Sequence, residues 1–226
     1  SNVSLNANTS VNGAVRVYGA NLSINAALTA TNSTVYLYGT GTVTEGATGF
    51  ISADKLALFS GAVTLGNISN NINTLAASGV STLTYVNSGA LSIGTVNPTG
   101  INATGDVRIE TLTGDLTVSQ NVTTTSTSAN AVLLNAGKSA IVGMAAGGNI
   151  LISGSPSMTA GTGGILRLMG GSVADSTGLT ALVGSRSGRF RYNSDESVSN
   201  FTIALRPNEV NAIYREQPTA YANINS

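Results

Sequence analysis

The chain has 226 residues, of which 42% are apolar and only 9% are charged, and its ten basic and ten acidic residues cancel. Balanced charge leaves no field of one sign to attract nucleic acid or an anionic membrane. Because cysteine and histidine do not occur, disulfides, thiol nucleophiles, Ser-His-Asp triads and histidine metal sites are excluded.

Apolar-polar-apolar triplets recur from the start of the chain, as expected for strands with one buried face. A first series advances in steps of about 20 to 27 residues, and a second series follows it by about 7 to 9 residues. The first series comprises Val15-Arg16-Val17, Val35-Tyr36-Leu37, Leu56-Ala57-Leu58, Leu83-Thr84-Tyr85, Val107-Arg108-Ile109 and Val132-Leu133-Leu134. The second comprises Val3-Ser4-Leu5, Leu22-Ser23-Ile24, Val63-Thr64-Leu65, Leu91-Ser92-Ile93, Leu116-Thr117-Val118 and a less regular Ile150-Leu151-Ile152, with Val43 at the position of a missing member.

This repeat predicts an all-β fold, a right-handed parallel β-helix (β-solenoid) with three short strands in each turn. The frame of leucine-rich repeats does not appear, and a propeller blade needs about 40 residues. Inward Val, Leu and Ile would stack on their equivalents in neighbouring turns. Outward positions need only be soluble, and Ser, Thr and Asn meet that requirement. Nine or ten turns would give a rod roughly 45 Å long.

The composition changes near residue 179, and nine of the twenty charged residues lie from Arg186 onward. We expect a β-helix shaft over residues 1–178, then a capping segment and a linker toward a following module over residues 179–226. The cap would span about 179–215, and the tail would start at Glu216. A terminal turn exposes its core and needs an atypical cap. The candidates to supply it are Phe190, Tyr192, Phe201 and Leu205.

The repeats Thr104-Gly105-Asp106-Val107-Arg108-Ile109 and Thr113-Gly114-Asp115-Leu116-Thr117-Val118 resemble the shafts of filamentous-haemagglutinin-like proteins, large exoproteins exported by two-partner secretion. The stretches Gly188-Arg189-Phe190-Arg191-Tyr192-Asn193-Ser194-Asp195 and Asn211-Ala212-Ile213-Tyr214-Arg215-Glu216 resemble the segment that ends such a shaft. The resemblance covers the whole chain and rests on composition and repeat style. It implies a right-handed β-helix, an extracellular location at the bacterial cell surface and a role in adhesion or biofilm matrix.

Asp106 and Asp115, with Glu110 nearby, are the best carboxylate pair for chemistry. Each Asp lies in a Thr-Gly-Asp turn that opens a strand, where an Asp side chain bonds local backbone N–H groups. We therefore assign both a turn-forming role. The sequence predicts no enzyme, and no catalytic, cofactor-binding or metal-binding residue.

Other motifs have structural interpretations. The Gly-rich stretches 143–148 and 161–164 have neither the acids of a calcium β-roll nor the Lys-Ser/Thr of a phosphate loop, so we interpret them as corners. The Thr run at 123–128 is confined to one loop, unlike an ice-binding face. Asn-x-Ser/Thr sequons, such as that at Asn8, occur in a chain rich in these residues and leave glycosylation open. The basic cluster of Arg186, Arg189 and Arg191, followed by Asp195 and Glu196, predicts a local salt-bridged cap.

These features predict an extracellular structural or adhesin shaft of a large bacterial surface protein, which mediates attachment or matrix contacts without catalysis. Two alternatives stay open. One is a self-assembling surface-layer or fibre subunit, because the ends of stacked strands offer open edges. The other is a carbohydrate-binding β-helix, by fold analogy. The expected partners are other protein chains, copies of itself or surface glycans, with no nucleic acid and no membrane insertion.

Overall fold

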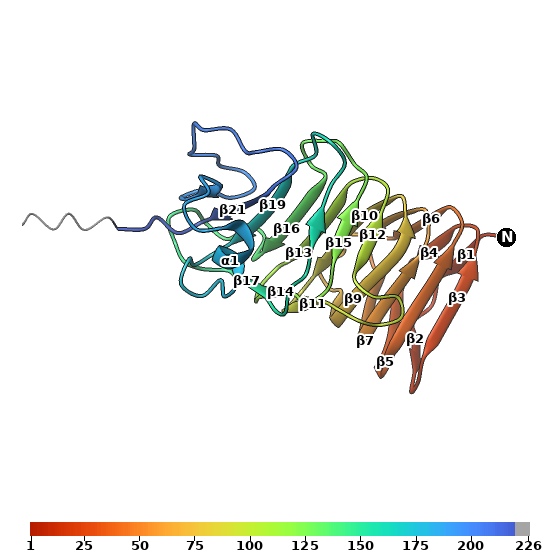
Figure 1. Ribbon diagram of the computed structural model, residues 1–226. Coiled ribbons are helices and arrows are strands. Elements are labelled where there is room, and N and C mark those ends of the chain that lie inside the picture. Colours follow the sequence, from red (N-terminus) through yellow and green to blue (C-terminus); the bar gives the residue numbers. More distant parts are fainter. Residues whose placement is uncertain (220–226) are drawn as a thin grey trace, which may run out of the picture.

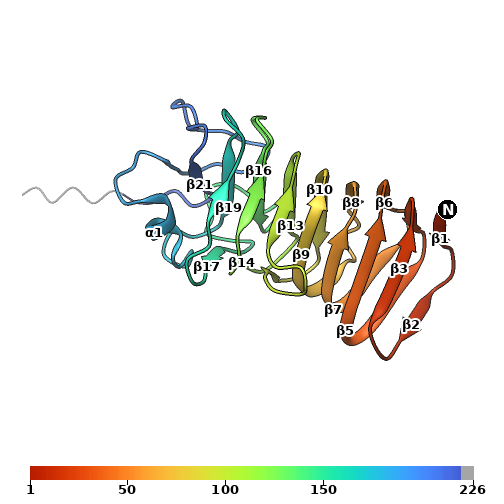
Figure 2. The same ribbon diagram turned by 45° about the vertical axis from the view of Figure 1, so that its right-hand side comes forward.

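In a computed structural model, which describes residues 1–219, the chain winds into a parallel β-solenoid, as predicted. The coils stack along a single axis and follow one another in sequence order until the last coils (Figure 1, Figure 2). Every pairing between its named strands is parallel. The one α-helix of the described residues, α1 (Leu179–Val183), has five residues.

A ten-stranded sheet runs along one side of the solenoid, with one strand from each coil. At about 4.8 Å between strands, it extends over roughly 43 Å, close to the predicted length. In spatial order its strands are β1 (Val3–Leu5), β4 (Leu22–Ile24), β6 (Thr42–Glu45), β8 (Ala62–Leu65), β10 (Thr82–Asn87), β13 (Val107–Thr111), β16 (Val132–Ala136), β19 (Leu166–Gly170), β21 (Val210–Tyr214) and β20 (Phe190–Arg191).

An eleven-stranded sheet forms the rest of the wall. In the second to fourth coils one long strand continues around the corner (β5, β7 and β9). In the first coil and in the later coils two short strands take its place, since β5 pairs with both β2 and β3, and β9 pairs with both β11 and β12. The strands are β2 (Thr9–Val11), β3 (Val15–Gly19), β5 (Ala27–Gly39), β7 (Phe50–Phe59), β9 (Asn71–Val80), β11 (Leu91–Ile93), β12 (Ile101–Ala103), β14 (Leu116–Val118), β15 (Val122–Thr124), β17 (Ile150–Ile152) and β18 (Met158–Thr159).

The core lies between the two sheets and consists of stacked aliphatic side chains. In β14, for example, Leu116 and Val118 are fully buried, whereas Thr117 points outward. This alternation follows from the period of two in a strand. Each fully buried aliphatic side chain contributes about 1.5–3 kcal/mol relative to an exposed one, so the ladder of equivalents supplies most of the stability.

Each of the two predicted triplet series was wrong at one point, where it changes sheets: the first series between Leu58 and Leu83, and the second between Leu65 and Leu91. Leu56 pairs with Leu75 in the eleven-stranded sheet, and Val63 pairs with Leu83 in the ten-stranded sheet. Strand β9 has Leu75-Ala76-Ala77 where the other coils have an aliphatic triplet. Because β9 lacks this triplet, its coil could not be recognised from the sequence pattern. The step of 27 residues from Leu56 to Leu83 therefore joined strands of different sheets.

Late coils carry long excursions, and the segment predicted as a cap also contributes a strand. Leu166 pairs with Val210 across an excursion that contains α1 and β20. The chain passes to the end of the stack, forms β20, and returns to insert β21 between β19 and β20. The ten-stranded sheet therefore extends beyond residue 178 to Tyr214.

The expected tail at Glu216 does not begin there, because this residue is anchored to the last coils. Its backbone N–H donates to the Gly171 carbonyl at 3.1 Å, and its carboxylate accepts the Val173 N–H at 2.7 Å. Residues 220–226 of the predicted linker lie outside the described residues.

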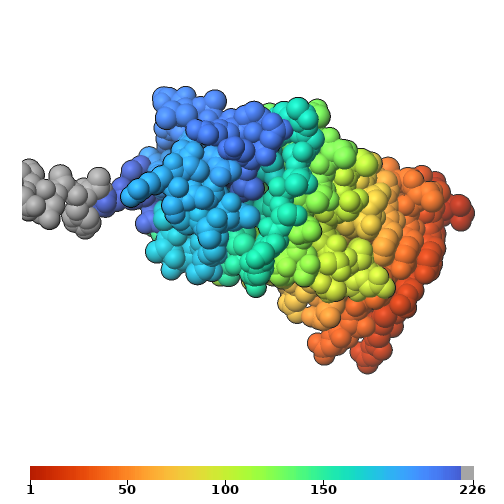
Figure 3. All heavy atoms as spheres, in the orientation of Figure 1, coloured from red at the N-terminus to blue at the C-terminus, as the bar shows by residue number. Residues whose placement is uncertain are grey.

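The four apolar residues expected in the cap divide into two groups. Phe190 packs against the core, Tyr192 stacks on Tyr214 with 5.8 Å between ring centroids, and the guanidinium of Arg191 lies over the ring of Phe201. Leu205 instead packs on the outer surface of the ten-stranded sheet. Figure 3 shows this C-terminal segment, in blue, gathered at one end of the stack, with the first coil, in red, at the other.

Candidate functional site

The most elaborate polar arrangement lies on the outer surface of the ten-stranded sheet. Strand register places Arg108, Leu133 and Arg167 in one outward column, because β13, β16 and β19 are consecutive neighbours. In β13, Val107 and Ile109 enter the core, so Arg108 must point outward. Two strand spacings separate the backbones of the two arginines by about 9.6 Å.

A groove with a volume of about 370 Å³ follows this column. Leu133 and Met169 form its apolar floor, and both are buried because they pack with Ile213 and Leu205. Its rim is polar and carries charges of both signs. The lining residues are Thr84, Asp106, Arg108, Asn130, Leu133, Arg167, Met169 and Glu196.

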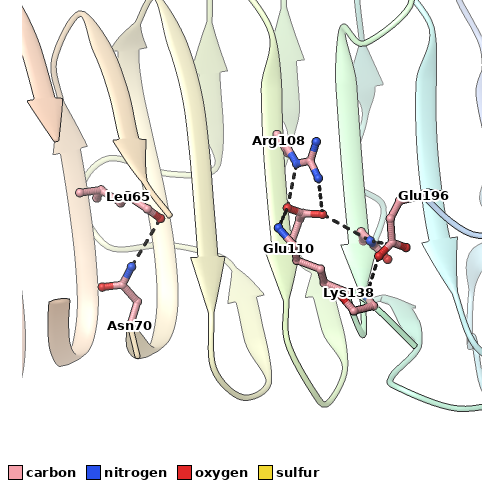
Figure 4. A network of polar contacts seen from close by, with 8 residues as sticks. Leu65, Asn70, Arg108, Glu110, Lys138 and Glu196 are labelled. Carbon is pink, nitrogen blue, oxygen red and sulfur yellow. Dashed lines mark hydrogen bonds and ion pairs between the residues drawn. The ribbon is translucent and has the colours of Figure 1, made fainter. Parts of the chain in front are cut away.

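Glu110 anchors one wall of the groove, and its side chain is completely buried. It accepts hydrogen bonds from Arg108 Nε at 2.7 Å, Arg108 Nη2 at 2.9 Å and Lys138 Nζ at 2.9 Å (Figure 4). Burial opposes ionisation of the carboxyl, but these bonds outweigh it and lower the pKa of Glu110. The same contact raises the pKa of Arg108. Arg108 is therefore a fixed cation with one guanidinium edge already used.

The guanidinium group of Arg167 makes fewer hydrogen bonds than that of Arg108. Burial, and secondly the positive charge of Arg108, lower its pKa, whereas Asp106 opposes that shift. Its Nη2 donates to the Asn130 amide oxygen. Its Nε is buried and has no hydrogen-bond partner among the described residues. An unsatisfied buried donor is costly, so the Nε of Arg167, next to the Nη2 that binds Asn130, favours an additional acceptor in the groove.

Glu196 closes the groove from the C-terminal segment. Its carboxylate accepts the Ser139 backbone N–H at 2.5 Å and the Asn135 side-chain amide at 3.2 Å (Figure 4). Strand β16 and the loop after it thus hold the segment around residue 196 against the sheet. The close packing of distant chain segments completes the groove.

The carboxylates singled out in the sequence have inter-coil roles. Asp106 accepts hydrogen bonds from the Ser126 and Ser128 hydroxyls at 2.5 and 2.7 Å, and Asp115 accepts the Asn149 N–H at 2.9 Å. All these donors belong to the next coil, so the predicted bonding to local backbone was wrong. Asp106 and Asp115 precede strands of different sheets, β13 and β14, and Glu110 pairs with cations rather than with either of them.

The expected ion pairs of the basic cluster with Asp195 and Glu196 do not form. Arg189 lies 3.3 Å from Glu209, without the alignment of a hydrogen bond. Arg191 donates instead to the backbone carbonyls of Gly188, Phe190, Ile203 and Ala204. Arg186 is exposed. The segment is therefore fastened mainly by an arginine bound to carbonyl groups.

Sequence reasoning missed Asn130, Arg167, Met169 and Glu196 as groove residues. A signal for Arg167 was present, because Leu166-Arg167-Leu168 repeats the pattern of Val107-Arg108-Ile109. The irregular spacing of the late coils hid it. Glu196 reaches the sheet through a long loop, which no periodicity predicts.

Within residues 1–219, no cluster of three or more Asp or Glu side chains has the arrangement of a metal site. No helix in this part of the chain is long and apolar enough to cross a membrane. Comparisons of the chain with protein families, curated proteins and solved structures found no match.

Proposed function

We propose that this chain is a non-catalytic shaft segment of an extracellular bacterial surface protein, of the filamentous-haemagglutinin-like type, which mediates attachment or matrix contacts. The observation that carries the proposal is the unbroken stack of coils from β1 to β21 in one parallel sheet. A continuous ladder of backbone hydrogen bonds along the axis makes such a stack a stiff spacer.

The outer surface of the early coils supports a structural role. Polar side chains bind one another along the axis, as in the Asn2–Asn21 and Asn6–Asn25 pairs, at 3.0 and 2.8 Å. Tyr18, Tyr38 and Phe59 form an aromatic ladder, with ring centroids 4.5 and 4.7 Å apart. Because the ring faces contact one another, the ladder reinforces adjacent coils.

The two ends of the stack differ, and this difference keeps the fibre alternative open. The last coils are covered by the segment around Arg191, whereas Val3, Leu5, Val15 and Val17 of the first coil are only half-buried. An unpaired strand edge with apolar side chains pairs readily with other strands. In the purified chain, end-to-end pairing would begin at this edge.

Electron microscopy and analytical ultracentrifugation of the purified chain distinguish these functions. We expect separate rods about 43 Å long that sediment as monomers. Regular filaments that disappear in a Val17→Lys variant would favour the self-assembling subunit. Antibody labelling of intact cells that produce the chain tests the location, and labelling only after lysis would contradict a surface shaft.

A further inference from the structure

We propose that the groove over Leu133 and Met169 binds a saccharide that carries a carboxylate, of the uronic-acid type. The carboxylate would bind the Nε–Nη2 edge of Arg167. This inference adds a ligand to the shaft and does not depend on how the shaft is anchored. If it fails, the shaft proposal, which rests on the coil stack, is unaffected.

The guanidinium edge of Arg167 identifies the anion-binding point. Its Nη2 binds the single amide oxygen of Asn130, and its Nε has no acceptor. A carboxylate has two oxygens in the spacing that matches both donors of such an edge. Asn130 is exposed and lies on a loop, so its side chain can move aside.

The neighbouring Arg108 increases the attraction for an anion. The positive charge of Arg108 reaches Arg167, since it contributes to the lowered pKa of that residue. Glu110 occupies Nε and Nη2 of Arg108 but leaves its Nη1 without a hydrogen bond among the described residues. A bound carboxylate would relieve the repulsion between the two guanidinium groups.

The rest of the groove favours a sugar over an acidic peptide. Asp106 and Glu196 on the rim accept hydrogen bonds, and Thr84 can both donate and accept. Sugar hydroxyls can donate to the two acids and accept from the arginines, whereas the carboxylates of an acidic peptide can only accept. The apolar floor of Leu133 and Met169 can contact the C–H face of a sugar ring. The volume of about 370 Å³ lies at the small end of ligand pockets.

Calorimetric titration of the full chain with trigalacturonate tests the proposal. We expect saturable binding that weakens with added salt, and weaker binding of the methyl-esterified trisaccharide. Arg167→Gln should reduce the affinity about tenfold or more, because it removes a bidentate charged contact. Arg167→Lys keeps the charge but not the edge, so it should give only a partial rescue.

Matched controls separate recognition from folding. Arg16→Gln removes an arginine that lies over Tyr36, on the other sheet, and should leave the affinity unchanged. Asn130→Ala should bind at least as well as the natural chain, because it frees the edge. Circular dichroism checks that each variant folds, and Asn130→Ala provides a test if the Arg167 variants do not.

Several outcomes would overturn the proposal. These are the lack of saturable binding, equal losses in Arg167→Gln and Arg16→Gln, and equal affinity for the methyl ester. Binding of pentaglutamate as tight as that of trigalacturonate would indicate a peptide site. Equally tight binding of inorganic sulfate would indicate a simple anion site.

Discussion

Glu45 of β6 pairs in register with Ile24 of β4, so a carboxyl group occupies an inward position of the sheet that is aliphatic in the preceding coil. Its Oε2 accepts the Asn67 N–H at 2.9 Å and the Asn70 side-chain amide at 3.2 Å. Its Oε1 is buried without a partner among residues 1–219. Burial raises the pKa of Glu45 to about 7 in spite of these two hydrogen bonds.

The first prediction concerns stability against pH. Because the pKa of Glu45 is higher in the folded chain (about 7) than its ordinary value of 4.5, folding takes up a proton between these values. The stabilisation is present below pH 4.5 and is lost as the pH rises to about 7, by roughly 2–3 kcal/mol. Glu45→Gln should therefore be more stable than the natural chain at pH 8 and lose this advantage near pH 4.5.

Urea unfolding at several pH values measures this difference. Glu45→Leu is the matched variant, because it also removes the titration but deprives Asn67 and Asn70 of their acceptor. It should be insensitive to pH in the same window and less stable than Glu45→Gln. If the difference in the free energy of unfolding between the natural chain and Glu45→Gln did not vary with pH, the raised pKa of Glu45 would be contradicted.

Glu45 also illustrates what the sequence could and could not predict. The fold was predictable because triplets such as Leu22-Ser23-Ile24 combine a strand period with a fixed repeat. Glu45 and the Leu75-Ala76-Ala77 stretch break that pattern. The positions that these residues occupy in the sheets are set by pairing with neighbouring coils, which the sequence pattern does not show. The groove required Arg108, Arg167 and Glu196 to be brought together by excursions of irregular length, which carry no periodic signal.

The second prediction tests the inward ladder. Leu116→Asp should prevent folding, because an unpaired charge would enter a fully buried stack. Thr117→Asp, one residue along the same strand on its outward side, is the matched control and should change stability by less than about 1 kcal/mol. Circular dichroism melting compares the two. Cooperative melting of soluble Leu116→Asp at the natural temperature would refute the register.

The third prediction concerns Arg191. Its guanidinium donates to four backbone carbonyls, at distances of 2.8 to 3.0 Å. Arg191→Met would leave these carbonyls without a donor and should destabilise the segment 188–204 locally, by about 2–4 kcal/mol. Amide hydrogen exchange should rise in this segment and stay unchanged in the first six coils. The exposed Arg186→Met is the control. Equal exchange in both variants would mean that Arg191 does not fasten the segment.

The last prediction tests whether the C-terminal segment stabilises the solenoid as strand β21 or serves only as a tether. Removal of residues 210–226 deletes β21, which pairs with β19 along its whole length. It also deletes the fully buried Arg215, whose guanidinium binds the carbonyl oxygens of Ala136, Ala146 and Gly148. The edge of β19 and the core beneath it would become exposed, and the loop after β16 would lose its anchor.

This truncation should therefore aggregate or melt at a much lower temperature, since an open apolar edge recruits other strands. Removal of residues 218–226 keeps β21, Arg215 and the contacts of Glu216, and should leave the melting temperature within about 2 °C of the natural value. Light scattering and thermal melting of both truncations measure the contrast. The shorter deletion controls for the loss of the terminus itself. If the 1–209 chain stayed monomeric with an unchanged melting temperature, β21 would not be needed for the stability of the solenoid.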